Sequence, residues 1–189
     1  MMMLKPRLLM VCTAAMFASS AFALTPAEHK AEKDRISAEY KAAKAQCKPL
    51  KGNAKDICQK EAEGHKKIGE AELKYRAEAS EGNRYQVAKA RADADYAVAK
   101  EKCDDAAGNA KDVCRQDAKA AHVKALEAAK VSEVRHDPAA KPSDVAEARR
   151  EASDKTREAD YKAAKERCDA LSGDAKDACV AQAKRQFGQ

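Results

Sequence analysis

The sequence YKAAKAQCKPLKGNAKDIC, at Tyr40–Cys58, occurs three times in this chain with small changes. The other copies are YAVAKEKCDDAAGNAKDVC at Tyr96–Cys114 and YKAAKERCDALSGDAKDAC at Tyr161–Cys179. The spacing from the tyrosine to the first cysteine, and from the first cysteine to the second, is the same in all three copies. A recurring segment of this kind predicts an array of similar supersecondary units.

Each copy has the pattern of a helical hairpin. Apolar residues recur at steps of four and three, which places them on one face of a helix. In the first copy these residues are Ile36, Tyr40, Ala43, Cys47 and Leu50. The third copy departs from the stripe, because Arg157 occupies the position of Ile36.

A glycine followed by a capping residue predicts the reversal of each hairpin. Glycine commonly ends a helix, and Asn or Asp commonly begins the next. The three pairs are Gly52–Asn53, Gly108–Asn109 and Gly173–Asp174. An aspartate three residues after each cap (Asp56, Asp112, Asp177) resembles a capping box. The two helices of each unit should therefore run antiparallel.

Two cysteines flank each predicted turn. Helix geometry places them opposite each other, so we expect three local disulfides. These are Cys47–Cys58, Cys103–Cys114 and Cys168–Cys179. Metal ligation is the alternative, although two cysteines separated by ten residues fit a zinc site poorly.

The composition predicts an all-α fold with a thin core. The 189 residues include no Trp and only three Phe, 36% are charged, and the net charge is +6. Alanine, lysine and glutamate are strong helix formers. We expect three tandem, disulfide-stapled hairpins, elongated or loosely packed and coiled-coil-like, in units 24–80, 81–137 and 138–189. Breaks are expected at 80–83 and at the proline-containing segment 136–142.

Residues 1–23 resemble a signal peptide. Lys5 and Arg7 precede a short apolar run, and Ala21–Ala23 fits the cleavage rule, so we expect cleavage after Ala23. The mature chain has no second hydrophobic segment, which predicts no transmembrane span. Six cysteines remain after cleavage, and an even number of cysteines in an exported chain is typical of a protein held together by disulfides.

Two recurring side chains are candidates for partner binding. Each tyrosine one heptad before its cysteine either packs on the return helix or offers an exposed ring. Each lysine two residues after the predicted cap either reaches the carbonyls that end the first helix or forms a basic tip. The residues are Tyr40, Tyr96, Tyr161, Lys55, Lys111 and Lys176.

The sequence contains no recognised catalytic, nucleotide-binding or metal-binding motif. The histidines, which are His29, His65, His122 and His136, do not cluster and are expected to be solvated. We therefore predict a protein that is not an enzyme, with no cofactor, no metal site and no nucleic-acid partner.

The repeated YKAAKxxC…GNAKDxC pattern resembles exported Ala/Lys-rich proteins of proteobacteria, often labelled TolA-like or cell-envelope biogenesis proteins. The resemblance implies a periplasmic repeat protein that acts as a structural spacer or interaction module in the cell envelope. The partner would be an envelope protein or an anionic envelope component. Two alternatives remain: a metal- or redox-responsive binder that uses the cysteine pairs, and a lysine-mediated binder of anionic envelope material.

Overall fold

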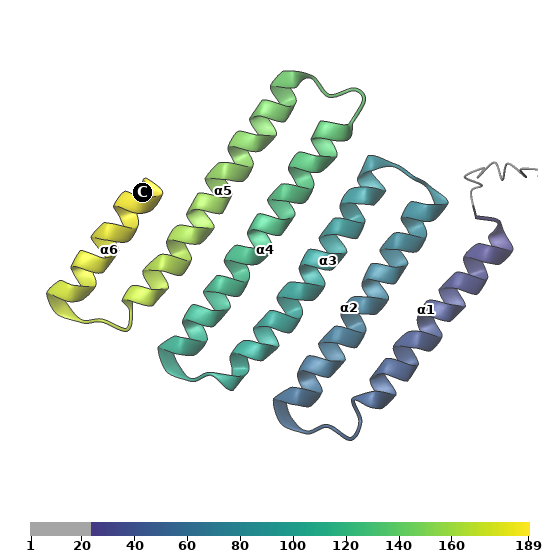
Figure 1. Cartoon of the computed structure of the whole chain (residues 1–189), viewed down its shortest axis with the longest axis horizontal. Helices are drawn as coiled ribbons and strands as arrows, with labels where there is room; N and C mark the ends of the chain where they lie inside the picture. Colours follow the sequence, from purple (N-terminus) through teal and green to yellow (C-terminus); the bar gives the residue numbers. More distant parts are fainter. Residues whose placement is uncertain (1–23) are drawn as a thin grey trace, which may run out of the picture.

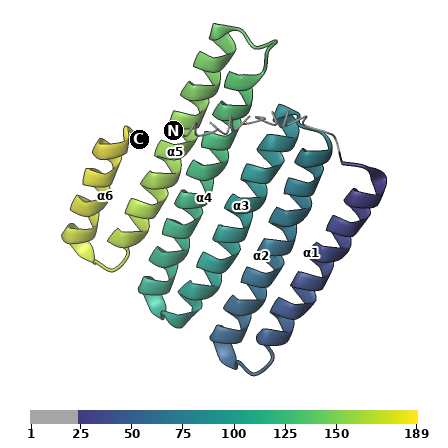
Figure 2. The same cartoon turned by 45° about the vertical axis from the view of Figure 1, so that its right-hand side comes forward.

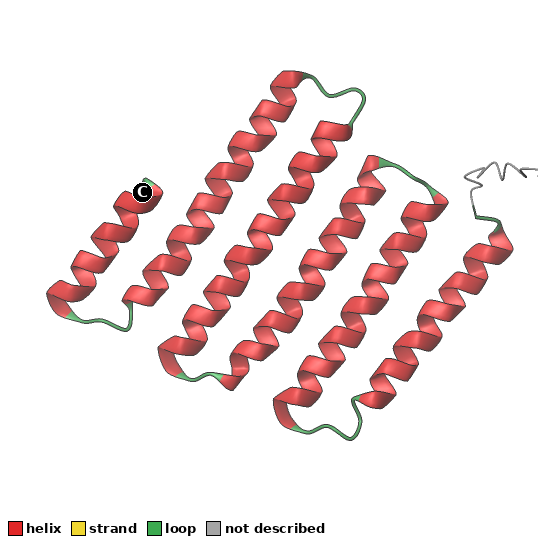
Figure 3. Ribbon diagram, viewed as in Figure 1, coloured by secondary structure: helices red, strands yellow, loops and turns green. Residues whose placement is uncertain are grey.

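A computed structural model describes residues 24–189, which fold into six α-helices joined by short loops (Figures 1 and 3). The helices are α1 (Pro26–Gln46), α2 (Gly52–Ala77), α3 (Glu81–Lys102), α4 (Gly108–His136), α5 (Pro142–Cys168) and α6 (Gly173–Phe187), with a short 3₁₀ helix η1 (Cys103–Asp105) after α3. The all-α prediction is confirmed. The predicted signal peptide, residues 1–23, lies outside the described residues.

The helices lie side by side in one antiparallel layer (Figures 1 and 2). Each helix packs mainly on its neighbours in the chain: α1 on α2, α2 on α3, α3 on α4, α4 on α5, and α5 on α6. The three hairpin turns share one edge of the layer, and the two linkers between hairpins lie at the opposite edge. The units therefore form one continuous array.

Small side chains make this close packing possible. Alanines such as Ala92, Ala120 and Ala163 are buried between helices, and Ile36 and Leu73 are the only larger aliphatic residues buried within 24–189. At Gly64 of α2, a Cβ atom would lie 2.7 Å from the Cβ of Ala94 on α3. A larger residue at Gly64 would therefore force these two helices apart.

All three predicted disulfides are confirmed. They join Cys47 to Cys58, Cys103 to Cys114 and Cys168 to Cys179, with Cα atoms 5.6, 5.5 and 5.7 Å apart. The first cysteine of each pair is almost fully buried, at 1% exposure. Each bridge covalently joins the two helices of one hairpin beside its turn.

The predicted helix ends need correction. α1 ends at Gln46, so Leu50, which was predicted to lie on the same helix face as Ile36 and Tyr40, lies in the turn instead and is 39% exposed. Gly52 begins α2 instead of ending α1, and its φ of 55° is a left-handed conformation that glycine adopts without strain. Gly108 and Gly173 begin α4 and α6 in the same way.

The prediction that Asn53, Asn109 and Asp174 are N-caps is also wrong. The capping positions are Lys51, Ala107 and Ser172, and none of them makes a side-chain capping hydrogen bond. Because the glycine already makes the reversal, the following residue lies within the first helical turn. No capping box involving Asp56, Asp112 or Asp177 forms.

The linkers agree with the predicted breaks to within a few residues. The first break is shorter than expected: α2 ends at Ala77, and Ser80 caps α3 by accepting a hydrogen bond of 3.2 Å from the Asn83 amide. Gly82 and Asn83 therefore belong to α3. The second break is as predicted, between His136 and Pro142.

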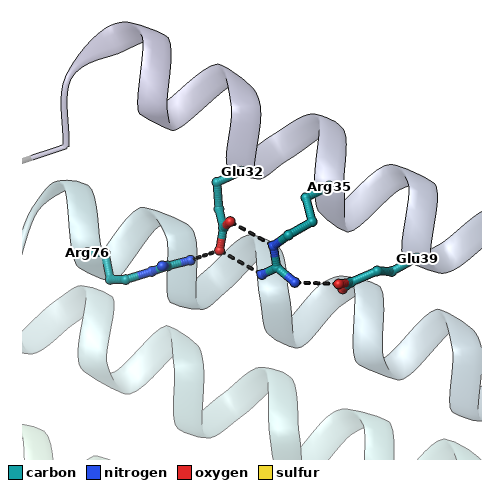
Figure 4. A network of polar contacts seen from close by, with 4 residues as sticks. All are labelled: Glu32, Arg35, Glu39 and Arg76. Atoms are coloured by element: carbon teal, nitrogen blue, oxygen red, sulfur yellow. Dashed lines mark hydrogen bonds and ion pairs between the residues drawn. The ribbon is translucent and has the colours of Figure 1, made fainter.

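An ion-pair network joins α1 and α2 far from their disulfide (Figure 4). Glu32 accepts hydrogen bonds from Arg35, at 2.7 and 2.8 Å, and from Arg76 of α2, while Arg35 also pairs with Glu39. The hydrogen bonds from Arg35 and then Arg76 lower the pKa of Glu32 to about 2. The network therefore supports the fold above the carboxyl's ordinary pKa and is lost as the pH falls through about 2.

We predict that removing one disulfide loosens one hairpin selectively. Replacing Cys47 and Cys58 together by Ala should cost about 3 kcal/mol, because the bridge no longer restricts the unfolded chain. Hydrogen exchange should accelerate mainly in α1 and α2, while α5 and α6 stay protected. A melting curve identical to that of the unchanged protein would show that the thin core suffices without the bridge.

Candidate functional site

The hairpin-turn edge holds most of the residues singled out in the sequence. Lys111 forms an ion pair of 3.2 Å with Asp104, and Lys176 forms one of 2.8 Å with Asp169. In both cases the aspartate directly follows the first cysteine of the hairpin. The hydrogen bonds from these lysines lower the pKa values of Asp104 and Asp169. Lys111 and Lys176 therefore tie the return helix to the turn.

The first turn lacks this arrangement. Lys48 occupies the position of Asp104 and Asp169, so Lys55 faces no acidic residue there. Lys48 and Lys51 are exposed and Lys55 is half-buried. Within residues 24–189, none of these three lysines has an ion-pair partner. One turn of the array is thus basic, whereas the other two are charge-paired.

Two asparagines link each hairpin to the next one. The Asn53 amide donates hydrogen bonds of 2.7 Å to the Glu101 carbonyl at the end of α3 and 2.8 Å to Asp105. Asn109 makes the equivalent link to the third hairpin when its side-chain amide takes the orientation that satisfies both neighbours: it then donates to the Glu166 carbonyl of α5 at 3.2 Å and accepts from the Ala170 amide at 3.0 Å. The repeated asparagine is therefore a connection between units.

The third copy has Asp174 at this position, and α6 has no further hairpin beside it within the described residues. An aspartate carboxylate cannot donate a hydrogen bond to a helix carbonyl. The copies that contact a following hairpin thus have asparagine at this position, and the third copy has aspartate.

The tyrosines of the repeat are all half-buried. The Tyr96 ring stacks on His122 of α4, with ring centroids 4.6 Å apart and planes 13° from parallel. The Tyr40 ring lies beneath the ammonium groups of Lys44 and Lys66, at 5.5 and 5.7 Å from its centroid. The rings of Tyr40 and Tyr96 thus contact the return helix. Of the two roles predicted for these tyrosines, this is packing rather than an exposed ring.

The expectation that all four histidines are solvated is wrong for His122. Its Nε2 atom lies 2.7 Å from an Asp93 carboxylate oxygen, and its side chain is 18% exposed. Burial raises the pKa of Asp93, but hydrogen bonds from Lys89 and His122 outweigh it and lower that pKa overall. The contact between His122 and the first helix of its hairpin could have been predicted from the sequence. His122 lies eight residues after Cys114, and Tyr96 lies seven residues before Cys103, so the disulfide places the two rings opposite each other across the hairpin.

His65 and His136 are exposed, and His136 lies 2.8 Å from the Ser132 carbonyl through its Nδ1 atom. The part of the chain from 24 onward contains no group of three or more His, Cys, Asp or Glu side chains placed to hold a metal ion. It also contains no helix that is both long enough and apolar enough to cross a bilayer.

Comparison with protein-family models, curated proteins and solved structures found no match to this chain.

We predict that the asparagine links stabilise contacts between hairpins. Asn53→Ala and Asn109→Ala should each cost about 1 kcal/mol, the usual net value of such hydrogen bonds. Amide exchange should accelerate at the ends of α3 and α5, respectively. The matched control is Asp174→Ala, which should change stability by less than about 0.5 kcal/mol. Equal losses in all three variants would mean that the position acts within its own hairpin.

Proposed function

We propose that this chain is a non-enzymatic, exported helical repeat protein that serves as a spacer or interaction module in the cell envelope. The observation that carries the proposal is the single layer of six helices, in which hairpins are stapled by disulfides and neighbouring hairpins are bridged by polar contacts. Such a layer exposes two broad faces and, along one edge, the three hairpin turns. Open helical arrays of this kind are suited to binding extended partners.

The cysteine chemistry supports export. All six cysteines of residues 24–189 lie in disulfides, which persist in oxidising compartments. The predicted signal peptide favours export, and the resemblance to exported Ala/Lys-rich proteins favours the bacterial periplasm. A metal- or redox-responsive role for the cysteines would require their reduction, which thiol counting of the exported protein would detect.

Contacts between hairpins also support a stiff spacer. Between α4 and α5, ion pairs join Lys124 to Asp160 at 2.7 Å and Lys155 to Glu127 at 3.1 Å. Between α2 and α3, Arg91 pairs with Glu72 at 2.6 Å. Each exposed pair contributes little alone, about 0 to 1 kcal/mol, but together they orient each hairpin against the next.

We predict that partners reach the turn edge. Leu50 and Leu171 are exposed apolar residues at equivalent positions of the first and third turns. A photo-crosslinking amino acid at either position, in cells that export the protein, should yield a discrete crosslinked product on gel electrophoresis. Lys41 is an exposed control on α1 away from the turns and should yield none. Absence of products from both turn positions would contradict an interaction role for this edge.

The basic first turn favours a second function, binding of anionic envelope material. We expect Lys48→Gln, Lys51→Gln and Lys55→Gln together to reduce salt-sensitive cosedimentation with vesicles containing phosphatidylglycerol, because exposed ionic contacts are screened by salt. The paired lysines supply the control: Lys111→Gln with Lys176→Gln should leave cosedimentation unchanged. Equal loss in both sets would assign binding to net charge rather than to the first turn.

A further inference from the structure

The third hairpin covers less of its first helix than the other two hairpins do. α6 has 15 residues, whereas α2 has 26 and α4 has 29. α6 ends at Phe187, because Gly188 takes the left-handed conformation with a φ of 65°. Among residues 24–189, the N-terminal half of α5 is therefore flanked by α4 but not by a return helix (Figure 1).

An open groove of about 750 Å³ lies along the middle of α5 and extends into this uncovered half. Its apolar lining includes Val131 of α4, Ala152 of α5 and Phe187 at the end of α6. The polar residues Ser153 and Thr156 also line it. We call this feature the α4–α5 groove.

The α4–α5 groove carries an excess of positive charge. Its acidic side chains, Glu127 and Asp160, are already paired with Lys155 and Lys124. Arg135 and Arg149 also line the groove, are exposed, and have no ion-pair partner in the described part of the chain. A negatively charged occupant could therefore pair with two arginines without breaking existing contacts.

The repeat position that Ile36 occupies in the first copy carries a different kind of residue in the third hairpin. Ile36 of the first copy is buried and lies against Gly69 of the return helix, and the equivalent Ala92 is also buried. The third copy has Arg157 there, exposed and paired with Asp154 at 2.6 Å. A cation replaces an apolar contact at the one copy in which the return helix stops early.

The shape of the groove favours an extended occupant over a small molecule. Small-ligand sites usually enclose most of their ligand, whereas this groove is open along its length. α5 lines it from Arg149 to Asp160, which is about 17 Å of helix. The valley between two antiparallel helices is also the surface on which an amphipathic helix docks.

We propose that the α4–α5 groove binds an acidic amphipathic helix of a partner protein. Its carboxylates would pair with Arg135 and Arg149, and its small apolar residues would lie on Val131, Ala152 and Phe187. This inference rests on the proposed interaction role and adds the binding surface and the chemistry of the partner.

The test uses the full disulfide-bonded chain and two fluorescent helical peptides of about twelve residues, the length that spans the groove. Both are alanine-rich, and they differ only in carrying Glu or Lys at the same positions. Fluorescence anisotropy should show binding of the Glu peptide that weakens with salt, and no binding of the Lys peptide. Arg135→Gln with Arg149→Gln should weaken binding about tenfold, the effect of losing two exposed ionic contacts.

Two further variants separate groove binding from general attraction. Lys41→Gln with Lys67→Gln removes the same charge from exposed positions on α1 and α2 and should leave binding unchanged. Ala152→Trp fills the groove without changing charge and should abolish binding while circular dichroism keeps the helical signal. Equal weakening in both charge variants, unchanged binding in Ala152→Trp, or no binding of the Glu peptide would each overturn the proposal.

Failure of the groove and failure of the proposed function are distinguishable. Crosslinks from Leu50 or Leu171 without peptide binding leave the interaction role standing and remove the groove from it. Peptide binding without crosslinks at the turn edge would leave the groove standing as a binding surface and remove the turn edge from the interaction role. Light scattering without peptide tests self-association, and a dimer that Ala152→Trp dissociates would assign the groove to a second copy of this chain and overturn an acidic partner.

Discussion

The rest of the structure depends on the covalent bridge beside each hairpin turn. Packing between these helices uses mainly alanine, which buries little apolar surface per residue, so a hairpin of this composition has only a modest hydrophobic contribution. The bridge instead limits the freedom of the unfolded chain and keeps the two helices close. With Cα atoms at 5.5 to 5.7 Å, the helices must approach closely at the turn, and alanine permits that approach along the remaining length. Covalent closure and small side chains are thus two parts of one arrangement.

The contacts between hairpins are of a different kind, because within residues 24–189 no disulfide crosses from one hairpin to the next. Asn53 and Asn109 connect the beginning of one return helix to the end of the following unit's first helix. Ion pairs then continue the contact along the layer, most densely between α4 and α5. Polar links of this type are directional, so they orient adjacent hairpins even where apolar burial is small. The array therefore consists of disulfide-closed hairpins, which follow one another along the chain and are held side by side by repeated non-covalent contacts.

The three copies share a framework, and they differ in charge at two places. The first turn has Lys48 where the other turns have an aspartate that pairs with a lysine, so it alone remains basic. The third hairpin has Arg157 at a position that is apolar and buried in the other two, beside a return helix that stops at Phe187. These departures place one basic turn at one end of the layer and one cationic groove at the other. We propose that these two surfaces bind anionic partners of different form.

The sequence by itself determined the local structure, because that information lies in residue spacing. Steps of three and four, the recurring glycine and the cysteine positions specify helices, reversals and bridges without reference to distant residues. The sequence did not determine the helix caps. Gly52 itself takes the left-handed conformation, so Asn53 lies inside the helix and its side chain instead donates a hydrogen bond to the Glu101 carbonyl. Only the tertiary structure decided that contact, and likewise the partners of Lys111, Lys176 and His122. Each of those side chains is positioned by a neighbouring segment whose approach depends on how the helices pack, which spacing within one segment does not encode.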